Sequence, residues 1–235
     1  MELSSNQVYL GNARLKKAGV KIDYSEEQIQ ELVKCSKDID YFCKNYMKIV
    51  SVDEGVISLE LYDFQKDIMK SVVQNRFTIC KMPRQSGKTT TMIAIILWFV
   101  LFNESFNCAI LANKASTARE ILSRLQMAYE WLPPWLQQGL VEWNKGSLEL
   151  ENGSKILASS TSASSIRGGS FSLVYLDEFA FVDNTLQEEF FASVYPTISS
   201  GNTSRVMITS TPKGMNLFYK LWVDAVEGRN EYLPI

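Results

Sequence analysis

The residues that most clearly suggest a binding or catalytic role lie in Met82-Pro-Arg-Gln-Ser-Gly-Lys-Thr-Thr90. This segment contains the Gly-Lys-Thr sequence of a phosphate-binding loop. In such a loop, backbone N–H groups at a helix N-terminus hold phosphate oxygens, the lysine reaches the β- and γ-phosphates, and the hydroxyl after it binds magnesium. Lys88 and Thr89 would take the last two roles. We expect ATP to contact Pro83, Arg84, Gln85, Ser86, Gly87, Lys88, Thr89 and Thr90.

Met82 departs from this motif, because the first glycine of the pattern belongs at that position. A surface turn that happens to carry Gly-Lys-Thr is therefore an alternative. The flanking sequence favours the phosphate-binding loop, since a buried strand is predicted before it and a long apolar helix after it.

A second chemical group follows the apolar stretch Leu173-Val-Tyr-Leu176, which is predicted to be a strand and ends in Asp177 and Glu178. At the carboxyl edge of a parallel sheet, both carboxylates would lie next to the loop. Asp177 would hold magnesium, and Glu178 would accept a proton from the attacking water. An isolated Asp-Glu pair is also typical of a solvated loop start. Together with the loop, the pair predicts hydrolysis of ATP.

Two arginines are candidates for stabilising the charge that develops on a transferred phosphoryl group. Arg84 lies in the loop itself, and Arg167 lies in a glycine-containing segment just before the acidic strand. From there Arg167 could reach the nucleotide of a neighbouring subunit. A surface salt bridge is the alternative for either side chain.

Two further segments fit the same site. Thr209, Ser210 and Thr211 end a predicted strand, where their hydroxyls could sense the γ-phosphate; capping the next helix is the other role open to them. Gln65 precedes the loop on a predicted helix, and one amide can satisfy both edge groups of adenine. A solvated glutamine is equally ordinary.

Short apolar strands alternate with helical patterns from residue 76 onward, which predicts a mainly parallel sheet covered by helices on both faces. An amphipathic helix with Ser25 as N-cap is predicted over 25–48, and another over 61–73. The predicted core strands are 76–81, 107–112, 172–177 and 205–210, the helices are 88–101, 116–131, 186–194 and 215–227, and 148–150 with 155–158 form a predicted hairpin.

The amino-acid composition excludes several kinds of catalytic and metal site. The 235 residues include no histidine, which excludes histidine-based triads, histidine-ligated zinc and imidazole bases. The formal charge of -2 gives no overall positive field for nucleic acid. The cysteines have no paired spacing and are expected to be reduced core residues. The most apolar stretch, 92–102, is too short for a bilayer, and no signal peptide is present, so a cytosolic protein is expected.

These motifs together resemble the ATPase domain of the large terminase subunit, the DNA-packaging motor of tailed bacteriophages, and most closely its T-even group. The resemblance extends from about residue 60 to the end of the sequence. It rests on Phe64-Gln65, Pro83-Arg-Gln-Ser-Gly-Lys-Thr-Thr90, Val141-Glu-Trp-Asn-Lys-Gly-Ser147, Ile166-Arg-Gly-Gly-Ser170, Leu176-Asp-Glu178 and Thr209-Ser-Thr-Pro-Lys-Gly214. The family commonly replaces the first loop glycine.

The resemblance implies an α/β P-loop fold of the additional-strand, catalytic-glutamate (RecA-like) type. Residues 1–60 would be a helical segment within a small lid subdomain, and residues 61–235 the ATPase core. The implied cofactors are ATP and Mg²⁺. The implied roles are phosphate and metal binding by Lys88 and Thr89, metal binding by Asp177, the catalytic base for Glu178, adenine contact by Gln65, coupling for Thr209 to Thr211, and the loop and intersubunit arginines for Arg84 and Arg167.

The resemblance also implies partners. Family members act as a ring, a pentamer, on the portal protein with the small terminase subunit, and move double-stranded DNA into a procapsid in the host cytoplasm, with no membrane involved. We expect the isolated chain to be monomeric. Members carry a C-terminal nuclease domain, and because the sequence stops at Ile235, no nuclease activity is expected here.

Two other functions remain open at this point. One is a superfamily 2 helicase-like translocase core, which shares the glutamine motif and the Asp-Glu pair but needs a second RecA-like domain. The other is a nucleotide-binding assembly module that holds ATP without turnover. Glu178 argues against the assembly module, because a base that activates water is needed only for hydrolysis.

Overall fold

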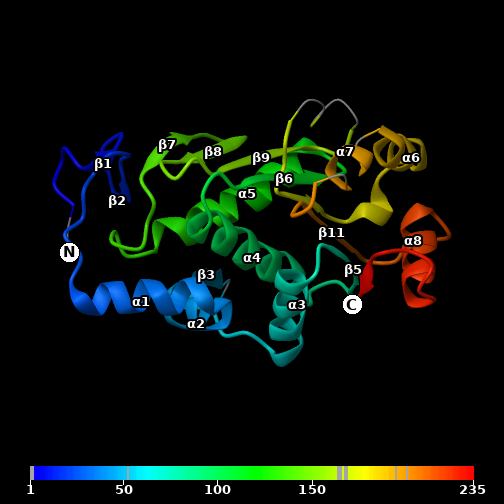
Figure 1. Cartoon of the computed structure of the whole chain (residues 1–235), viewed down its shortest axis with the longest axis horizontal. Helices are drawn as coiled ribbons and strands as arrows, with labels where there is room; N and C mark the ends of the chain where they lie inside the picture. Colours follow the sequence, from blue (N-terminus) through cyan, green and yellow to red (C-terminus); the bar gives the residue numbers. More distant parts are fainter. Residues whose placement is uncertain (1–2, 52, 163–165, 167–168, 194, 200) are drawn as a thin grey trace.

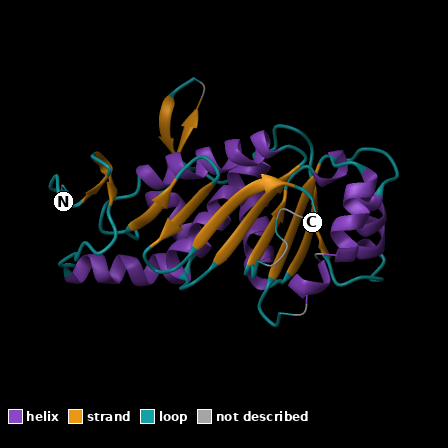
Figure 2. Cartoon of the chain, turned by 90° about the horizontal axis from the view of Figure 1, so that it is seen from above, coloured by secondary structure: helices purple, strands orange, loops and turns teal. Residues whose placement is uncertain are grey.

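An eight-stranded sheet lies at the centre of the computed structural model, which describes residues 3–51, 53–162, 166, 169–193, 195–199 and 201–235 (Figure 2). The strand order is β12-β5-β11-β10-β6-β9-β8-β7. Strands β12 to β9 run parallel, and β8 and β7 are antiparallel additions. The bounds are β5 (Phe77–Lys81), β6 (Asn107–Ala112), β7 (Leu140–Trp143), β8 (Ser147–Leu150), β9 (Lys155–Ser160), β10 (Leu173–Leu176), β11 (Arg205–Ser210) and β12 (Leu233–Pro234).

Alternate residues of the core strands belong to two separate hydrophobic clusters, one on each face of the sheet. On β10, Leu173 and Tyr175 pack with one cluster, whereas Val174 and Leu176 pack with the other. The first face is covered by α3 (Asp63–Gln74), α4 (Lys88–Phe102) and α5 (Ala115–Glu130); the second by η1 (Phe179–Phe181), α6 (Asn184–Ser193), α7 (Tyr195–Ser199) and α8 (Leu217–Val226). The predicted sheet with helices on both faces is confirmed.

Helix α4 is apolar on all sides, as expected of a helix enclosed by protein. It lies between the sheet and the N-terminal helices, next to α5 (Figure 1). Its residues from Thr91 to Leu101 are all buried. The start of α4, where the loop ends, is therefore held in a fixed position relative to the strands.

Among the described residues, no helix is long and apolar enough to cross a membrane.

The described residues before α3 form two helices and two hairpins. One helix was predicted over 25–48, but Asp38 has extended backbone and its carboxylate accepts the N–H groups of Asp40 and Tyr41, so the chain ends one helix there and starts the next. Ser25 is the predicted N-cap. The elements are β1 (Val8–Tyr9), β2 (Asn12–Lys16), α1 (Glu26–Lys37), α2 (Ile39–Tyr46), β3 (Lys48–Ser51) and β4 (Gly55–Ser58).

The N-terminal helices share a core with α4. The Trp98 indole N–H donates to the Cys35 carbonyl at 2.8 Å, and the Phe42 and Phe102 rings pack edge to face at 5.6 Å. By contrast, the β3–β4 hairpin projects from the body of the chain (Figure 2). The four cysteines, Cys35, Cys43, Cys80 and Cys108, are buried and free, as predicted.

Candidate functional site

The loop between β5 and α4 carries the predicted phosphate-binding residues at a helix N-terminus. Gly87 is the N-cap of α4 and has a φ of 73°, a left-handed conformation that glycine adopts without strain. Met82, which replaces the glycine of the motif, is only 6% exposed and packs into the core, and its N–H continues the β5 ladder to the Ser210 carbonyl at 3.1 Å. A large residue is therefore accommodated, because its side chain packs into the hydrophobic core.

The side chain of Gln65 contacts both the start of α3 and the loop. Its side-chain oxygen accepts the Tyr62 N–H at 3.0 Å and so caps α3, while its amide nitrogen lies 3.5 Å from the Ser86 carbonyl. The side chain is 4% exposed. In this structure the amide of Gln65 thus connects the start of α3 to the loop, and its contact with adenine stays a prediction.

Asp177 lies just beyond the end of β10 and is 4% exposed. The Tyr175 hydroxyl donates to its Oδ1 at 2.6 Å, and the Thr209 hydroxyl lies 3.4 Å from the same oxygen. Burial raises the pKa of Asp177, and the hydrogen bond from Tyr175 opposes this shift by favouring the carboxylate. Burial also holds the pKa of the Tyr175 hydroxyl well above its usual value, so it remains a donor.

Glu178 is held by residues of the loop helix and of the predicted coupling segment. It forms an ion pair with Lys88, and its Oε2 accepts the Thr211 N–H at 3.0 Å and lies 3.4 Å from the Ser210 hydroxyl. Its φ of 47° is left-handed, which costs a residue with a side chain about 1–2 kcal/mol. These contacts hold the strained backbone in place and fix the carboxylate beside the lysine.

A cavity of about 510 Å³ lies between the loop and Glu178. Its charged side chains are three cations and one carboxylate, which suits a polyanionic ligand. Arg124 is the member that the sequence did not reveal: it comes from α5, and its guanidinium donates to the Thr90 hydroxyl at 3.0 Å. The lining residues are Arg84, Gln85, Ser86, Gly87, Lys88, Thr89, Thr90, Arg124 and Glu178.

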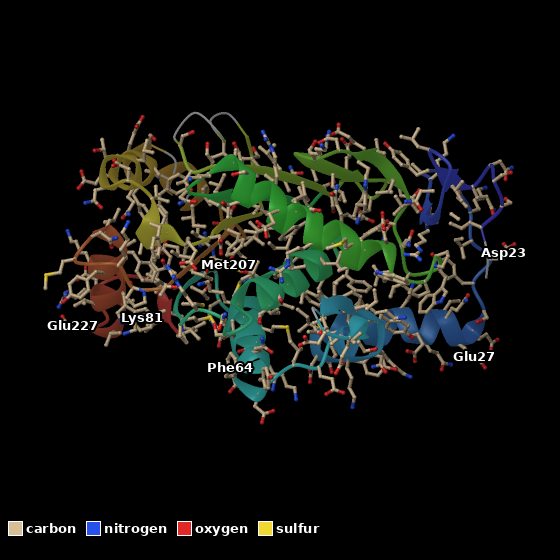
Figure 3. The ribbon with its side chains drawn as sticks, turned by 180° about the vertical axis from the view of Figure 1, so that it is seen from behind. Asp23, Glu27, Phe64, Lys81, Met207 and Glu227 are labelled. Carbon is tan, nitrogen blue, oxygen red and sulfur yellow. The ribbon has the colours of Figure 1, made fainter. Side chains whose placement is uncertain are left out.

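A second cavity, of about 880 Å³, lies on the other side of the loop and is mostly apolar. At its edge the Tyr62 and Phe64 rings stack with centroids 5.8 Å apart and an angle of 9° between their planes. Both rings are exposed, and Phe64 and Lys81, which also lines the cavity, are labelled in Figure 3. The exposed ring faces suit a planar aromatic group.

The predicted magnesium ligands fit a cation that is held jointly with phosphate. In the described part of the chain, the Asp177 hydrogen bonds reach Oδ1, and Oδ2 makes none. No group of three acidic, cysteine or histidine residues that could hold a metal occurs among the described residues. One carboxylate and the Thr89 hydroxyl match magnesium, which commonly binds through one or two carboxylates and substrate phosphates.

Arg84 and Arg167 are the two arginines predicted to stabilise the charge on the phosphoryl group. Arg84 is exposed, and its guanidinium lies 5.9 Å from the centre of the Phe181 ring. Arg167 lies outside the described residues, so its role stays a prediction. The structure thus brings together Lys88, Glu178, Asp177 and the predicted coupling residues Thr209, Ser210 and Thr211.

Comparison with known proteins identifies a terminase family. The family model described as terminase large subunit, T4likevirus-type, N-terminal, matches residues 79–235. Tripartite terminase subunit 3 of equine herpesvirus 2 (strain 86/87) is 24% identical over 128 residues, which are 52% of this chain and 18% of that protein.

Solved structures agree on the fold. The large terminase of bacteriophage HK97 superimposes with a TM-score of 0.72 at 19% identity, covering 85% of this chain and 43% of that one. The large terminase of a thermophilic bacteriophage, in complex with ADP, gives a TM-score of 0.57 at 14% identity over 75% of this chain and 45% of that one. The chain therefore spans less than half of either structure. The predicted P-loop fold is confirmed.

Proposed function

Since the chain belongs to the T4-type terminase large-subunit family and matches its N-terminal part, we propose that it hydrolyses ATP to drive double-stranded DNA into a viral procapsid. The observation that carries this proposal is the position of Glu178. The carboxylate that would activate water contacts both the loop lysine, Lys88, and the coupling residues Ser210 and Thr211. A protein that only held nucleotide would not need a carboxylate there.

Different residues of the chain have different roles in the proposed hydrolysis of ATP. Loop N–H groups and Lys88 hold the phosphates, and the apolar cavity beside Tyr62 and Phe64 takes the base. Glu178 leaves Lys88 when phosphates replace it, and then accepts the proton of the attacking water. Magnesium, held by Asp177 and Thr89, would supply positive charge against the β- and γ-phosphates.

Charge stabilisation and coupling involve other side chains. Arg84 and Arg124 line the phosphate cavity from the same chain, and Arg167 would act on the nucleotide of a neighbouring subunit. Because Thr209 contacts Asp177, and Thr211 contacts Glu178, loss of the γ-phosphate would be passed to the end of β11 and on to α8.

We also propose an assembly and a location for the chain. We place the chain in a pentameric ring on the portal protein, with the small terminase subunit, in the host cytoplasm, and residues 1–60 in a lid beside the site; the isolated chain would be monomeric. The herpesvirus relative is named as one subunit of a tripartite terminase, which supports partner subunits. Because the formal charge of -2 gives no overall positive field, we propose that DNA contacts a local surface or the assembled ring.

The test is ATP turnover by the purified chain, with and without Mg²⁺ and with double- or single-stranded DNA. The expected result is Mg²⁺-dependent hydrolysis that EDTA abolishes, with stimulation by double-stranded DNA. Stimulation by single strands together with strand separation would favour a helicase-like translocase. Nucleotide binding without turnover would favour a silent assembly module. The Glu178→Gln variant is the control for contaminating ATPases.

A further inference from the structure

A buried tyrosine joins the predicted magnesium carboxylate to the coupling segment. The Tyr175 side chain is fully buried, at 0% exposure. Its hydroxyl donates to Asp177 Oδ1 at 2.6 Å and lies 3.1 Å from the Thr209 hydroxyl. Thr209 is also fully buried and lies 3.4 Å from the same carboxylate oxygen. The three side chains lie within hydrogen-bonding distance of one another, and the single Thr209 hydroxyl proton can be donated either to Tyr175 or to Asp177.

The sheet determines this triangle. Strands β10 and β11 are parallel neighbours, and Leu176 pairs with Ile208, so Asp177 and Thr209 are the next residues along each strand. Tyr175 and Asp177 are two residues apart and therefore point to the same face, the face that α4 covers. This is where α4 begins with Lys88 and Thr89.

The Tyr175 ring alone would fill its place in the core, so packing does not explain the hydroxyl. A phenylalanine would fill nearly the same space, whereas a buried hydroxyl is costly unless it has partners. Here the partners are the two functional groups themselves. Among the described residues, both bonds to Asp177 reach Oδ1, which leaves Oδ2 free of protein donors.

From this geometry, and resting on the proposed function above, we propose that Tyr175 is a positioning residue. It fixes the Asp177 carboxylate so that Oδ2 is presented to magnesium, and it ties that orientation to Thr209 at the end of the coupling strand. Metal binding and the position of β11 are then set together. Tyr175 contacts no substrate and takes no part in proton transfer.

The experiment measures binding without turnover. A fluorescent, non-hydrolysable ATP analogue is titrated at a series of Mg²⁺ concentrations and in EDTA, for the parent protein and for Tyr175→Phe, Thr209→Val and the double variant. Tyr129→Phe is the matched control, because Tyr129 is also fully buried and its hydroxyl bonds a backbone carbonyl, that of Gln138, away from the site. Thermal unfolding shows that each variant is folded.

The expected result is a rise of roughly tenfold in the Mg²⁺ concentration for half-maximal binding in Tyr175→Phe, with analogue affinity in EDTA unchanged. Thr209→Val should shift in the same direction, and the double variant should fall within about twofold of the worse single variant, because both remove one linked unit. Tyr129→Phe should match the parent.

A Mg²⁺ requirement of Tyr175→Phe within about twofold of the parent overturns the inference and leaves the proposed function intact. Additive effects of the two substitutions overturn the link to Thr209. If Tyr175→Phe does not fold, an unchanged Mg²⁺ requirement in Thr209→Val overturns the link as well. A parent protein without magnesium-dependent binding would instead contradict the proposed function itself.

Discussion

Lys88 and Glu178 form an ion pair that joins the first residue of α4 to the residue that follows Asp177 after β10. The lysine that should hold phosphate is thus paired with the carboxylate that should activate water. On the proposed function, nucleotide phosphates would compete with Glu178 for the lysine. Phosphate binding would then release the carboxylate that is proposed to act as the base.

The Glu178→Gln variant should bind Mg²⁺-ATP at least as tightly as the parent, because the competing carboxylate is gone. Hydrolysis should fall by about 10²–10⁴-fold, since no general base remains. Equilibrium binding and single-turnover hydrolysis measure the two effects separately. Hydrolysis equal to that of the parent would contradict the assigned role.

The Lys88→Ala variant should lose ATP binding, because the cation that neutralises the β- and γ-phosphates is removed. Isothermal titration with ATP provides the measurement. Lys155→Ala is the matched control: it deletes the same charge from a surface pair with Glu149 at 3.1 Å and should bind ATP normally. Parent-like affinity in Lys88→Ala would exclude the loop as the phosphate site.

Replacing Arg124 by alanine should lower kcat/KM for ATP by about tenfold to a hundredfold, the scale of one lost charge-assisted hydrogen bond. Its guanidinium lines the phosphate cavity next to Thr90. Arg119→Ala removes an exposed arginine from the same helix and should leave steady-state kinetics unchanged. Equal kinetics in the two variants would show that Arg124 is only a surface residue.

Gly87→Ala should destabilise the loop and abolish ATP binding. The left-handed φ of 73° costs alanine about 1–2 kcal/mol, and its Cβ would overlap the amide nitrogen of buried Gln65. Urea unfolding together with ATP titration tests this. Gly146→Ala, whose Cβ would meet only an ordinary contact with Asn144, should change neither quantity. Normal ATP affinity in Gly87→Ala would contradict the observed loop geometry.

Asp177→Asn should stabilise the metal-free protein at neutral pH by on the order of 1 kcal/mol. Burial raises the pKa of Asp177 above 3.8, so folding must bury a charged group once the pH exceeds the raised pKa. The gain should shrink as the pH falls through the raised pKa and vanish below 3.8, where the carboxyl is protonated in both the folded and the unfolded state. Urea unfolding across this pH range measures it.

The matched control for that experiment is Asp53→Asn, which removes an exposed carboxylate and should change the unfolding free energy by less than about 0.5 kcal/mol. A destabilised Asp177→Asn protein at neutral pH would mean that the contacts from Tyr175 and Thr209 outweigh the burial of the charge.

Much of the fold could be predicted because its signals are local. The buried parallel strands are continuous apolar runs, and the loop and acid pair lie at strand ends, where a parallel sheet brings them together. The short pieces could not be predicted: β12 has two residues, one of them proline, and pairs only because β5 offers its edge. Asp38, which divides α1 from α2, was hidden within one amphipathic pattern.

The site was less predictable where tertiary contacts decide a role. Nothing local distinguishes Arg124 from the other exposed arginine of α5; only the packing of α5 against α4 brings it to the loop. Tyr175 looked like an ordinary core residue of a strand, because its function depends on the register between β10 and β11. Sequence spacing located the groups on each strand, and only the sheet showed which ones meet.

The four buried cysteines have a practical consequence for experiments. Burial raises the pKa of Cys80 to about 12 and that of Cys35 to about 12, and Cys43 and Cys108 are equally enclosed, so maleimide dyes should find almost no native thiolate. Met215 is 89% exposed and stands between the Thr209–Thr211 segment and α8. A cysteine introduced there could carry a single fluorophore and report the movement of that segment in real time, without first removing any native thiol.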